Sequence, residues 1–296
     1  MKKRLFSLAM ALVFCTAFAA CNNSSAGSDA GSKESSLAAS DASAASSAAD
    51  ASSLSAAEAE SNDESDYAYL QDKGTMVIGY TVYEPMNYTD DEGNFTGFDT
   101  ELAKAVCKDL GVEPEFVEIN WDTKEVELGA RSIDCIWNGL TITDERKATM
   151  SITDPYVENA QVVVMKADAD YTDISSLEGG TVCAEAGSAG ETTIEGNESL
   201  LKAEYVAKDV QTACLMEVAA GTADAAVLDM TLANAMIGEG TDYANLVIKD
   251  RLAVEDYGVA FRKGSDICDA VNDIFVELRE SGFLPELAER YRLDLA

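Results

Sequence analysis

The 296-residue sequence contains no histidine, only four prolines and two tryptophans, and 21 basic residues against 54 acidic ones. Without histidine, the chain lacks the side chain that most often acts as a general base or a zinc ligand near neutral pH. A formal net charge of −33 opposes binding to the phosphates of nucleic acids and to anionic lipids. We therefore exclude nucleic acid as a partner, and we expect neither a metal nor a cofactor.

The seven cysteines show no metal-binding spacing. Cys15 and Cys21 lie near the N-terminus, and no C-x-x-C motif occurs among the others. We expect the other five to be small buried hydrophobic residues, although one disulfide among them stays open as an alternative. These five are Cys107, Cys135, Cys183, Cys214 and Cys268.

Long apolar runs are also absent after residue 20, where none approaches the 18 or so residues of a membrane span. Residues 1–20 differ, because basic residues at positions 2 to 4 precede an apolar run. This order is typical of an export signal. The small residues before Cys21 resemble the end of a bacterial lipoprotein signal, which implies cleavage after residue 20 and lipidation of Cys21. An uncleaved N-terminal anchor is the alternative.

Residues 22–66 consist mainly of Ser, Ala, Asp and Glu. Such a segment cannot bury enough apolar surface to offset its chain entropy, so we expect 21–66 to form a disordered tether that begins at the lipidated cysteine. A flexible chain of this length has an end-to-end reach of roughly 40 Å. The protein would then be extracytoplasmic and held by lipid at the outer face of the cell membrane.

Strand-like and helix-like stretches alternate after residue 67, which indicates an α/β fold with a largely parallel sheet. The expected strands are 76–80, 114–119, 132–139, 160–165, 181–187, 223–229 and 257–265. The expected helices are 98–111, 123–130, 211–221, 269–281 and 284–291, with others opening at Thr143 and Ser188.

Helix 98–111 has the most regular pattern. Three apolar residues at positions 102, 106 and 110 share one face. Asp99 or Thr100 is the expected N-cap, and Gly111 is the expected stop.

Two segments with the same order of helix, turn, aspartate and strand suggest two similar lobes. They are ELGARSIDCIWNGLT (127–141) and EVAAGTADAAVLDMT (217–231). Their alignment places Gly139 and Asp229 at corresponding strand ends. Ligands bind beyond the carboxyl ends of strands in open α/β sheets, so we expect both lobes to face one cleft.

The segment NGLTITDER (138–146) ends an apolar strand in hydroxyl groups and a guanidinium. With Thr143 as N-cap, Arg146 falls in the first turn of a helix, where an anion is favoured. Its planar guanidinium suits a carboxylate, and Thr141 and Gly139 offer further donors. The alternative is that Arg146 pairs with a neighbouring surface acid.

The second half has a similar strand end at AGSAGE (186–191), where Ser188 and Glu191 have capping-box spacing. A helix cap without a ligand is the alternative there. Asp229 ends another apolar strand and needs a partner if it is buried, either a ligand ammonium or the backbone of the next helix. An arginine for a carboxylate and an aspartate for an ammonium together describe an α-amino acid.

Aromatic residues complete the expected site. Tyr83 follows the first strand and Trp121 the second, and two flat rings can sandwich a ligand side chain. We expect Trp137, which lies within a strand, to belong to the core.

Motifs along nearly the whole folded part carry a family resemblance. They are GYTVYEPMNY and GNFTGFDTELAKAV (within 79–106), SIDCIWNGLTITDER (132–146), SITDPYV (151–157), AEAGSAGE (184–191), GTADAAVLD (221–229) and YGVAFRKG (257–264). In these motifs the chain resembles the extracellular amino-acid-binding proteins of ABC importers, family 3. The resemblance implies a periplasmic-binding-protein-like fold, with two α/β lobes joined by two hinge strands. Lobe 1 would comprise 67–157 plus 256–296, and lobe 2 would comprise 158–255.

The resemblance also implies roles for individual residues. In lobe 1 it assigns the ligand α-carboxylate to Gly139, Thr141 and Arg146. Lobe 2 would contribute Gly187, Ser188 and Ala189 to the carboxylate and Asp229 to the α-ammonium, and Tyr83 and Trp121 would flank the ligand side chain.

The sequence departs from the family near the first strand. Thr81 stands where many members carry an aspartate that reaches the ligand side chain, and Glu84 follows shortly after. Ala189 replaces a common Thr or Ser, so only its backbone N–H would help. The substrate is therefore only a hypothesis: a polar amino acid such as arginine, lysine or glutamine.

The expected function is that of a monomeric binding protein, not an enzyme, which hands its ligand to the permease subunits of an ABC transporter. One alternative is a dehydratase of a cyclic acid on the same fold, for which Glu84, Glu158 or Glu185 would be candidate acids. Another is an amino-acid sensor that signals through a separate protein.

Overall fold

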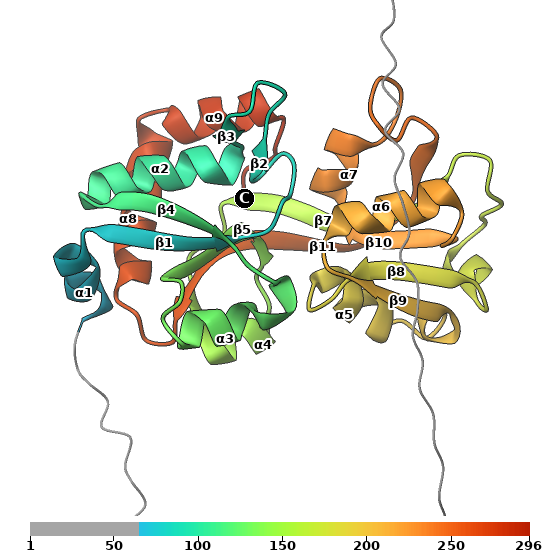
Figure 1. Ribbon diagram of the computed structural model, residues 1–296, viewed down its shortest axis with the longest axis horizontal. Coiled ribbons are helices and arrows are strands. Elements are labelled where there is room, and N and C mark those ends of the chain that lie inside the picture. Colours follow the sequence, from blue (N-terminus) through green and yellow to red (C-terminus); the bar gives the residue numbers. More distant parts are fainter. Residues whose placement is uncertain (1–64) are drawn as a thin grey trace, which may run out of the picture. The chain divides into compact units, whose positions relative to one another are not determined.

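The computed structural model describes residues 65–296 (Figure 1). The predicted signal, Cys21 and nearly all of the predicted tether lie outside the described residues. Helix α1 (Asp66–Lys73) is capped by Ser65, and Asp66 is buried in an ion pair with Arg262. Asp66 therefore belongs to the folded part and not to the tether, because it neutralises a half-buried arginine.

Helices and strands alternate as the sequence predicts. The other helices are α2 (Phe98–Leu110), α3 (Lys124–Gly129), α4 (Asp144–Thr149), α5 (Ala189–Glu195), α6 (Gln211–Ala220), α7 (Met230–Met236), α8 (Ile267–Glu280) and α9 (Phe283–Tyr291). The strands are β1 (Thr75–Tyr80), β2 (Tyr88–Thr89), β3 (Phe95–Thr96), β4 (Glu113–Glu118), β5 (Cys135–Thr141), β6 (Met150–Ile152), β7 (Val157–Lys166), β8 (Thr181–Glu185), β9 (Glu204–Lys208), β10 (Ala225–Asp229) and β11 (Leu246–Arg262).

The main sheet has the order β4-β1-β5-β11-β7-β10-β8-β9, and β6 pairs with β11. Strands β4, β1 and β5 are mutually parallel, as are β10, β8 and β9. Strands β7 and β11 run antiparallel to each other and to the strands beside them. The sheet is therefore mixed, with a parallel group at each end. We call the part built on β4, β1 and β5 the first lobe and the part built on β10, β8 and β9 the second lobe.

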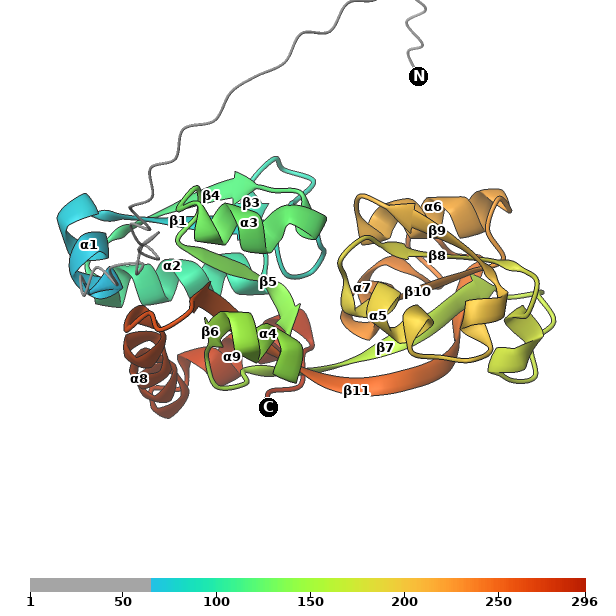
Figure 2. The ribbon, with the colours of Figure 1, turned by 90° about the horizontal axis from the view of Figure 1, so that it is seen from below.

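Two long strands connect the lobes. Figure 2 shows β7 and β11 passing side by side from one lobe to the other. Strand β11 begins at Leu246, whereas the sequence predicts a strand only from residue 257. The missed half mixes apolar residues with charged ones and is partly exposed, so it lacks the long apolar run from which a buried strand is recognised. Because these are the hinge strands, the two-lobe fold is confirmed; the lobe boundaries stay a prediction.

Helices cover both faces of each parallel group (Figure 1). In the first lobe, α2 packs on one face of the sheet and α3 on the other. Residues Leu102, Val106 and Leu110 of α2 are buried, as predicted, and Gly111 ends the helix with a φ of 74°. Trp137 is fully buried and belongs to the core, also as predicted.

The predicted N-cap of α2 is wrong. The helix begins at Phe98 and is preceded by Gly97, whose φ is 123°. A Cβ at Gly97 would lie 2.2 Å from the carbonyl oxygen of Met86, so this entry requires glycine. Asp99 lies one residue inside the helix with its carboxylate buried, and it accepts hydrogen bonds from Gly139 and Tyr156.

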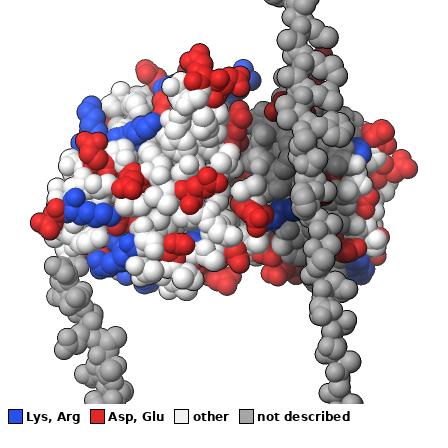
Figure 3. Space-filling view, in the orientation of Figure 1, with Lys and Arg blue, Asp and Glu red and all other residues white. Residues whose placement is uncertain are grey.

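The five predicted structural cysteines are all buried and unpaired. Among residues 65–296, no helix has the length and apolar character needed to cross a membrane. Acidic side chains are spread over the visible surface of both lobes in Figure 3, in keeping with the strongly negative net charge.

Candidate ligand-binding site

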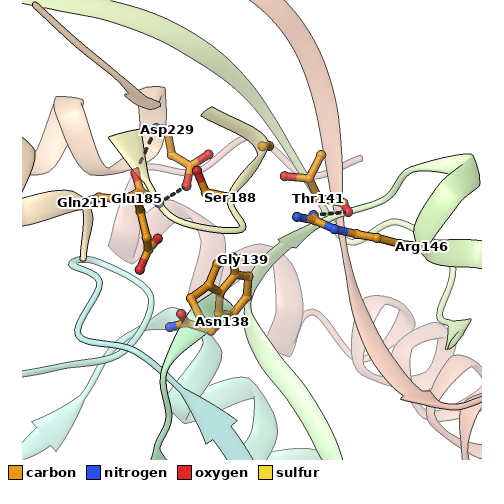
Figure 4. A pocket seen from close by; sticks show the side chains of 10 residues that line it. Asn138, Gly139, Thr141, Arg146, Glu185, Ser188, Gln211 and Asp229 are labelled. Carbon is orange, nitrogen blue, oxygen red and sulfur yellow. Dashed lines mark hydrogen bonds between the residues drawn. The ribbon is translucent and has the colours of Figure 1, made fainter. Parts of the chain in front are cut away.

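A cavity lies where the two lobes meet, at the carboxyl ends of β5, β8 and β10 (Figure 4). Both lobes contribute to its walls. The lining residues are Trp121, Asn138, Gly139, Thr141 and Arg146 from the first lobe and Glu185, Ser188, Ala189, Gln211 and Asp229 from the second. Seven of the nine predicted ligand-binding residues therefore line one cavity. The second-lobe strands run opposite to those of the first lobe, so the carboxyl ends of both groups face the cleft between the lobes.

Arg146 is the cation of this cavity. Its guanidinium is buried and donates one hydrogen bond to the carbonyl oxygen of Thr141 at 2.7 Å. It donates a second hydrogen bond, of 3.3 Å, to the carbonyl oxygen of Gly187 in the other lobe. Burial lowers the pKa of Arg146, and the charges of Glu255 and Asp229 oppose that shift. Arg146 forms no ion pair with a described acid, so the predicted alternative of a surface salt bridge is wrong.

The predicted caps on either side of the cleft are present. Thr143 caps α4 by accepting from the backbone N–H of Arg146, and Ser188 caps α5 by accepting from that of Glu191. The Glu191 carboxylate accepts from Gly187 N at 2.6 Å, so this N–H is already used. Gly187 does not line this cavity but a neighbouring pocket, and its carbonyl oxygen faces the first lobe.

Gly139 has a structural reason to be glycine. Its φ is 58°, and a Cβ there would lie 2.8 Å from the Tyr83 ring. The backbone N–H of Gly139 donates to Asp99 at 2.7 Å and is therefore not free for a ligand. Burial raises the pKa of Asp99 to about 7. Thus the strand end that carries Thr141 is fixed by a buried carboxyl group beneath it.

Asp229 is the acid at the second-lobe strand end, and it is buried. Its carboxylate accepts hydrogen bonds from the side-chain amides of Asn159, Gln161 and Gln211. Asp229 stands at the N-cap position of α7, as the alternative in the sequence supposed, but its side chain makes no capping hydrogen bond. Three neutral amides orient this carboxylate, and none of the ion pairs among residues 65–296 includes it, so a ligand ammonium would be a suitable partner.

Glu255, on hinge strand β11, lies behind Asp229. It accepts from the same amides of Asn159 and Gln161, at 2.6 and 2.9 Å. Burial and then the charge of Asp229 raise the pKa of Glu255 to about 8. The shared amides therefore connect the second-lobe site to both hinge strands.

The two predicted aromatic residues have different positions. Trp121 lines the cavity, and the ammonium of Lys124 lies 5.0 Å from the centre of its ring. Tyr83 does not line the cavity: it is buried beneath Gly139, and its hydroxyl lies 2.6 Å from that of Tyr257. The expected sandwich by these two rings is therefore wrong, because Tyr83 fills the space that the missing Cβ of Gly139 leaves.

Sequence reasoning missed several polar residues of the site. The sequence did not predict roles for these residues: Asn138, Gln211, Lys124, and Asn159 and Gln161 on β7. It suggested Glu185 only as a catalytic acid. One signal was available: Asn159 and Gln161 alternate with apolar residues in an otherwise buried strand. Polar residues with that spacing share one face, which a buried strand rarely accommodates without a function. Among the described residues, no cluster of possible metal ligands occurs.

Comparison with known proteins assigns the family. Residues 76–294 match the model of the bacterial extracellular solute-binding proteins, family 3. The chain belongs to this family. The arginine-binding extracellular protein ArtP of Bacillus subtilis is 29% identical over 225 residues, which cover 74% of this chain and 86% of ArtP.

Solved structures of similar proteins share the fold of this family 3 solute-binding protein. A mutant of ArgBP from T. maritima aligns with a TM-score of 0.71 at 32% identity, covering 76% of this chain and 98% of that one. The ancestral amino-acid-binding protein AncCDT-1, a precursor of cyclohexadienyl dehydratase, aligns with a TM-score of 0.69 at 31% identity, covering 77% and 99%. The family and fold implied by the sequence motifs are thereby confirmed.

Proposed function

We propose that this solute-binding protein captures a polar α-amino acid between its lobes and delivers it to the permease of an ABC transporter. One observation carries the proposal: Arg146 and Asp229, buried and of opposite charge, line the same cavity from different lobes. The charged ends of an amino acid backbone match this pair. Arginine, lysine and glutamine are the candidate ligands, and the arginine-binding relative ArtP supports the first of them.

In the proposed complex, the ligand carboxylate meets Arg146 and Thr141 from the first lobe and Ser188 and Ala189 from the second. The ligand ammonium meets Asp229. Each charge-assisted hydrogen bond contributes about 1.5–3 kcal/mol, and contacts from both lobes stabilise the closed arrangement over the open one. A permease that recognises the closed arrangement would then receive only loaded protein.

Attachment to the membrane is part of the proposal. A signal peptide over residues 1–20 and a lipid on Cys21 would keep the protein outside the cytoplasm and beside its permease. Mass spectrometry of the protein from membranes would test this, with the lipidated Cys21 as the expected N-terminus. A chain that retains residues 1–20 would contradict it.

Isothermal titration calorimetry of the purified chain against the twenty amino acids tests the binding function. The protein is first unfolded and refolded to remove any ligand that it carries. One-to-one binding of one or a few polar amino acids is expected, and no binding of any amino acid would overturn the proposal.

A dehydratase is the second candidate, favoured by the acid Glu185. Its carboxyl group is buried in the cavity, and burial followed by the charge of Asp229 raises its pKa to about 8. An acid that stays protonated near neutral pH can protonate a leaving hydroxyl group. Release of water from a cyclohexadienyl acid, followed by the ultraviolet absorbance of the aromatic product, would establish this activity.

A further inference from the structure

Glu185 is an acid in the ligand cavity that makes none of the contacts proposed for the ligand carboxylate and ammonium. It is the last residue of β8, its side chain is 3% exposed, and it lines the cavity. Its Oε1 atom has no hydrogen-bond partner among residues 65–296. A buried oxygen that accepts no hydrogen bond is costly, so its direction into a ligand cavity points to a donor on the ligand.

No described neighbour donates a hydrogen bond to Oε1 of Glu185. The charge of Lys124 lowers the pKa of Glu185, but the Lys124 ammonium donates to the carbonyl oxygens of Trp121 and Gly187. No ion pair within 4.0 Å joins Lys124 to Glu185. Asp229, the other acid that lines the cavity, has three amide donors of its own.

The position of Glu185 separates it from the carboxylate end of the cavity. Figure 4 shows its carboxyl group directed toward the side of the cavity where Asn138 lies, whereas Arg146 and Thr141 lie on the opposite side. An amino acid whose carboxylate meets Arg146 would therefore extend its side chain toward Glu185. Thr81, at the first strand, does not line the cavity, because its hydroxyl donates to Asn138 at 2.8 Å.

We propose that Glu185 selects the ligand side chain and that it selects one with a positive charge. The ligand class is thus the basic amino acids, with a guanidinium or ammonium group that donates to the Glu185 carboxylate from the second lobe. This inference rests on the proposed binding function and narrows its substrate.

Electrostatics give the inference a second support. The groups that act on Glu185 are Asp229 on β10, Lys124 on α3 and Gln211 on α6, and together with burial they hold its pKa at about 8. Without ligand the carboxyl group is therefore mostly neutral at pH 7. A ligand cation would favour the charged form, so the positive side chain would displace a proton from Glu185.

The test is calorimetry on the purified chain and its Glu185→Gln variant, with arginine, lysine and glutamine as ligands. The matched control is Glu204→Gln, the same change on exposed strand β9 of the same lobe. Wild type and control should bind a basic amino acid, whereas Glu185→Gln should bind it roughly 10- to 100-fold more weakly, as loss of a charged hydrogen bond implies. Glutamine affinity should change less than about threefold, because an amide can donate to either side chain.

Three results would overturn the inference in distinguishable ways. Wild-type protein that binds only neutral or acidic amino acids would exclude a basic ligand and leave the binding function standing. Equal losses for arginine and glutamine in Glu185→Gln would place Glu185 on the ligand ammonium. If wild type bound no amino acid, the proposed function itself would fail.

Discussion

Lys124 and Gly187 are joined by a hydrogen bond that crosses the cleft, with 2.9 Å between the ammonium nitrogen and the carbonyl oxygen. Lys124 begins α3 in the first lobe, and Gly187 follows β8 in the second. Arg146 donates to the same oxygen at 3.3 Å. Two first-lobe cations thus hold one second-lobe carbonyl group, and the protein itself supplies part of the attraction between its lobes.

The substitution Lys124→Met should weaken the binding of every amino acid ligand by a similar factor. The variant loses a charged donor across the cleft, which we expect to lower affinity roughly tenfold by making the closed arrangement less stable. Lys108→Met, on the exposed face of α2, should leave affinity unchanged. Calorimetry with two ligands of different side chains measures both effects. A loss confined to one of the ligands would show that Lys124 contacts the ligand directly.

Affinity for a basic amino acid should rise with pH between 6 and 8. The pKa of Glu185 is raised to about 8 without ligand, and a bound cation lowers it, so binding releases a proton below that pH. Affinity then increases by at most about tenfold per pH unit and levels off above pH 8. Calorimetric titrations at pH 6, 7 and 8, in buffers of different ionisation enthalpy, measure the number of protons released on binding.

The variant Glu185→Gln is the control for this pH dependence, because it should remove the rise. Glu255 also has a pKa raised to about 8, by burial and the charge of Asp229. Asp99 and Lys124 also have pKa values shifted into this range, to about 7 and about 8. A rise that persists in Glu185→Gln would assign the proton to one of these other groups and contradict the role given to Glu185.

The substitution Gly139→Ala should destabilise the protein even without ligand. A φ of 58° disfavours alanine, and the new Cβ would lie 2.8 Å from the Tyr83 ring. Strain and overpacking together should lower the free energy of unfolding by about 2–4 kcal/mol. Urea unfolding measures this loss. Gly129→Ala, at the end of α3 with no atom within 4 Å of the new Cβ, should be neutral or stabilising by about 0.5–1 kcal/mol.

Trp121→Ala should weaken ligand binding to an extent that depends on the ligand side chain. The Trp121 ring lines the cavity, so its loss removes stacking with a planar or cationic side chain but leaves the backbone contacts intact. We expect arginine to lose roughly tenfold in affinity and alanine, if it binds, to lose little. Trp121→Phe should restore most of the loss. Equal weakening of all ligands would mean that Trp121 acts only by holding Lys124.

The sequence predicted those parts of the fold and the site that follow from local patterns. Apolar strands β5 and β10 end in polar residues, and the carboxyl ends of the strands in two similar lobes were expected to face one cleft, so Arg146 and Asp229 were predicted there together. Thr143 was predicted as the N-cap of a helix whose first turn holds Arg146, and it caps α4. These predictions needed only strand periodicity and helix-capping chemistry.

The remaining parts depend on contacts between residues distant in sequence. Whether Tyr83 faces the ligand or the core depends on Gly139, 56 positions later, which leaves space for its ring. Asp99 has the side chain of a helix cap, but its hydrogen-bond donor, the Gly139 N–H, lies on strand β5, far along the sequence. The local sequence around Asp99 does not show that contact. Glu185 gains its significance because its buried Oε1 accepts no hydrogen bond from residues 65–296, which only the folded structure reveals.

The central claim is that Arg146 binds the α-carboxylate that all amino acids share. Calorimetry should compare the ligand-stripped wild type with Arg146→Ala and with Lys147→Ala, its exposed neighbour on α4. Arg146→Ala should lower affinity for every ligand at least about 100-fold, while Lys147→Ala should bind like wild type. Binding by Arg146→Ala within threefold of wild type would contradict the carboxylate assignment on which the account depends.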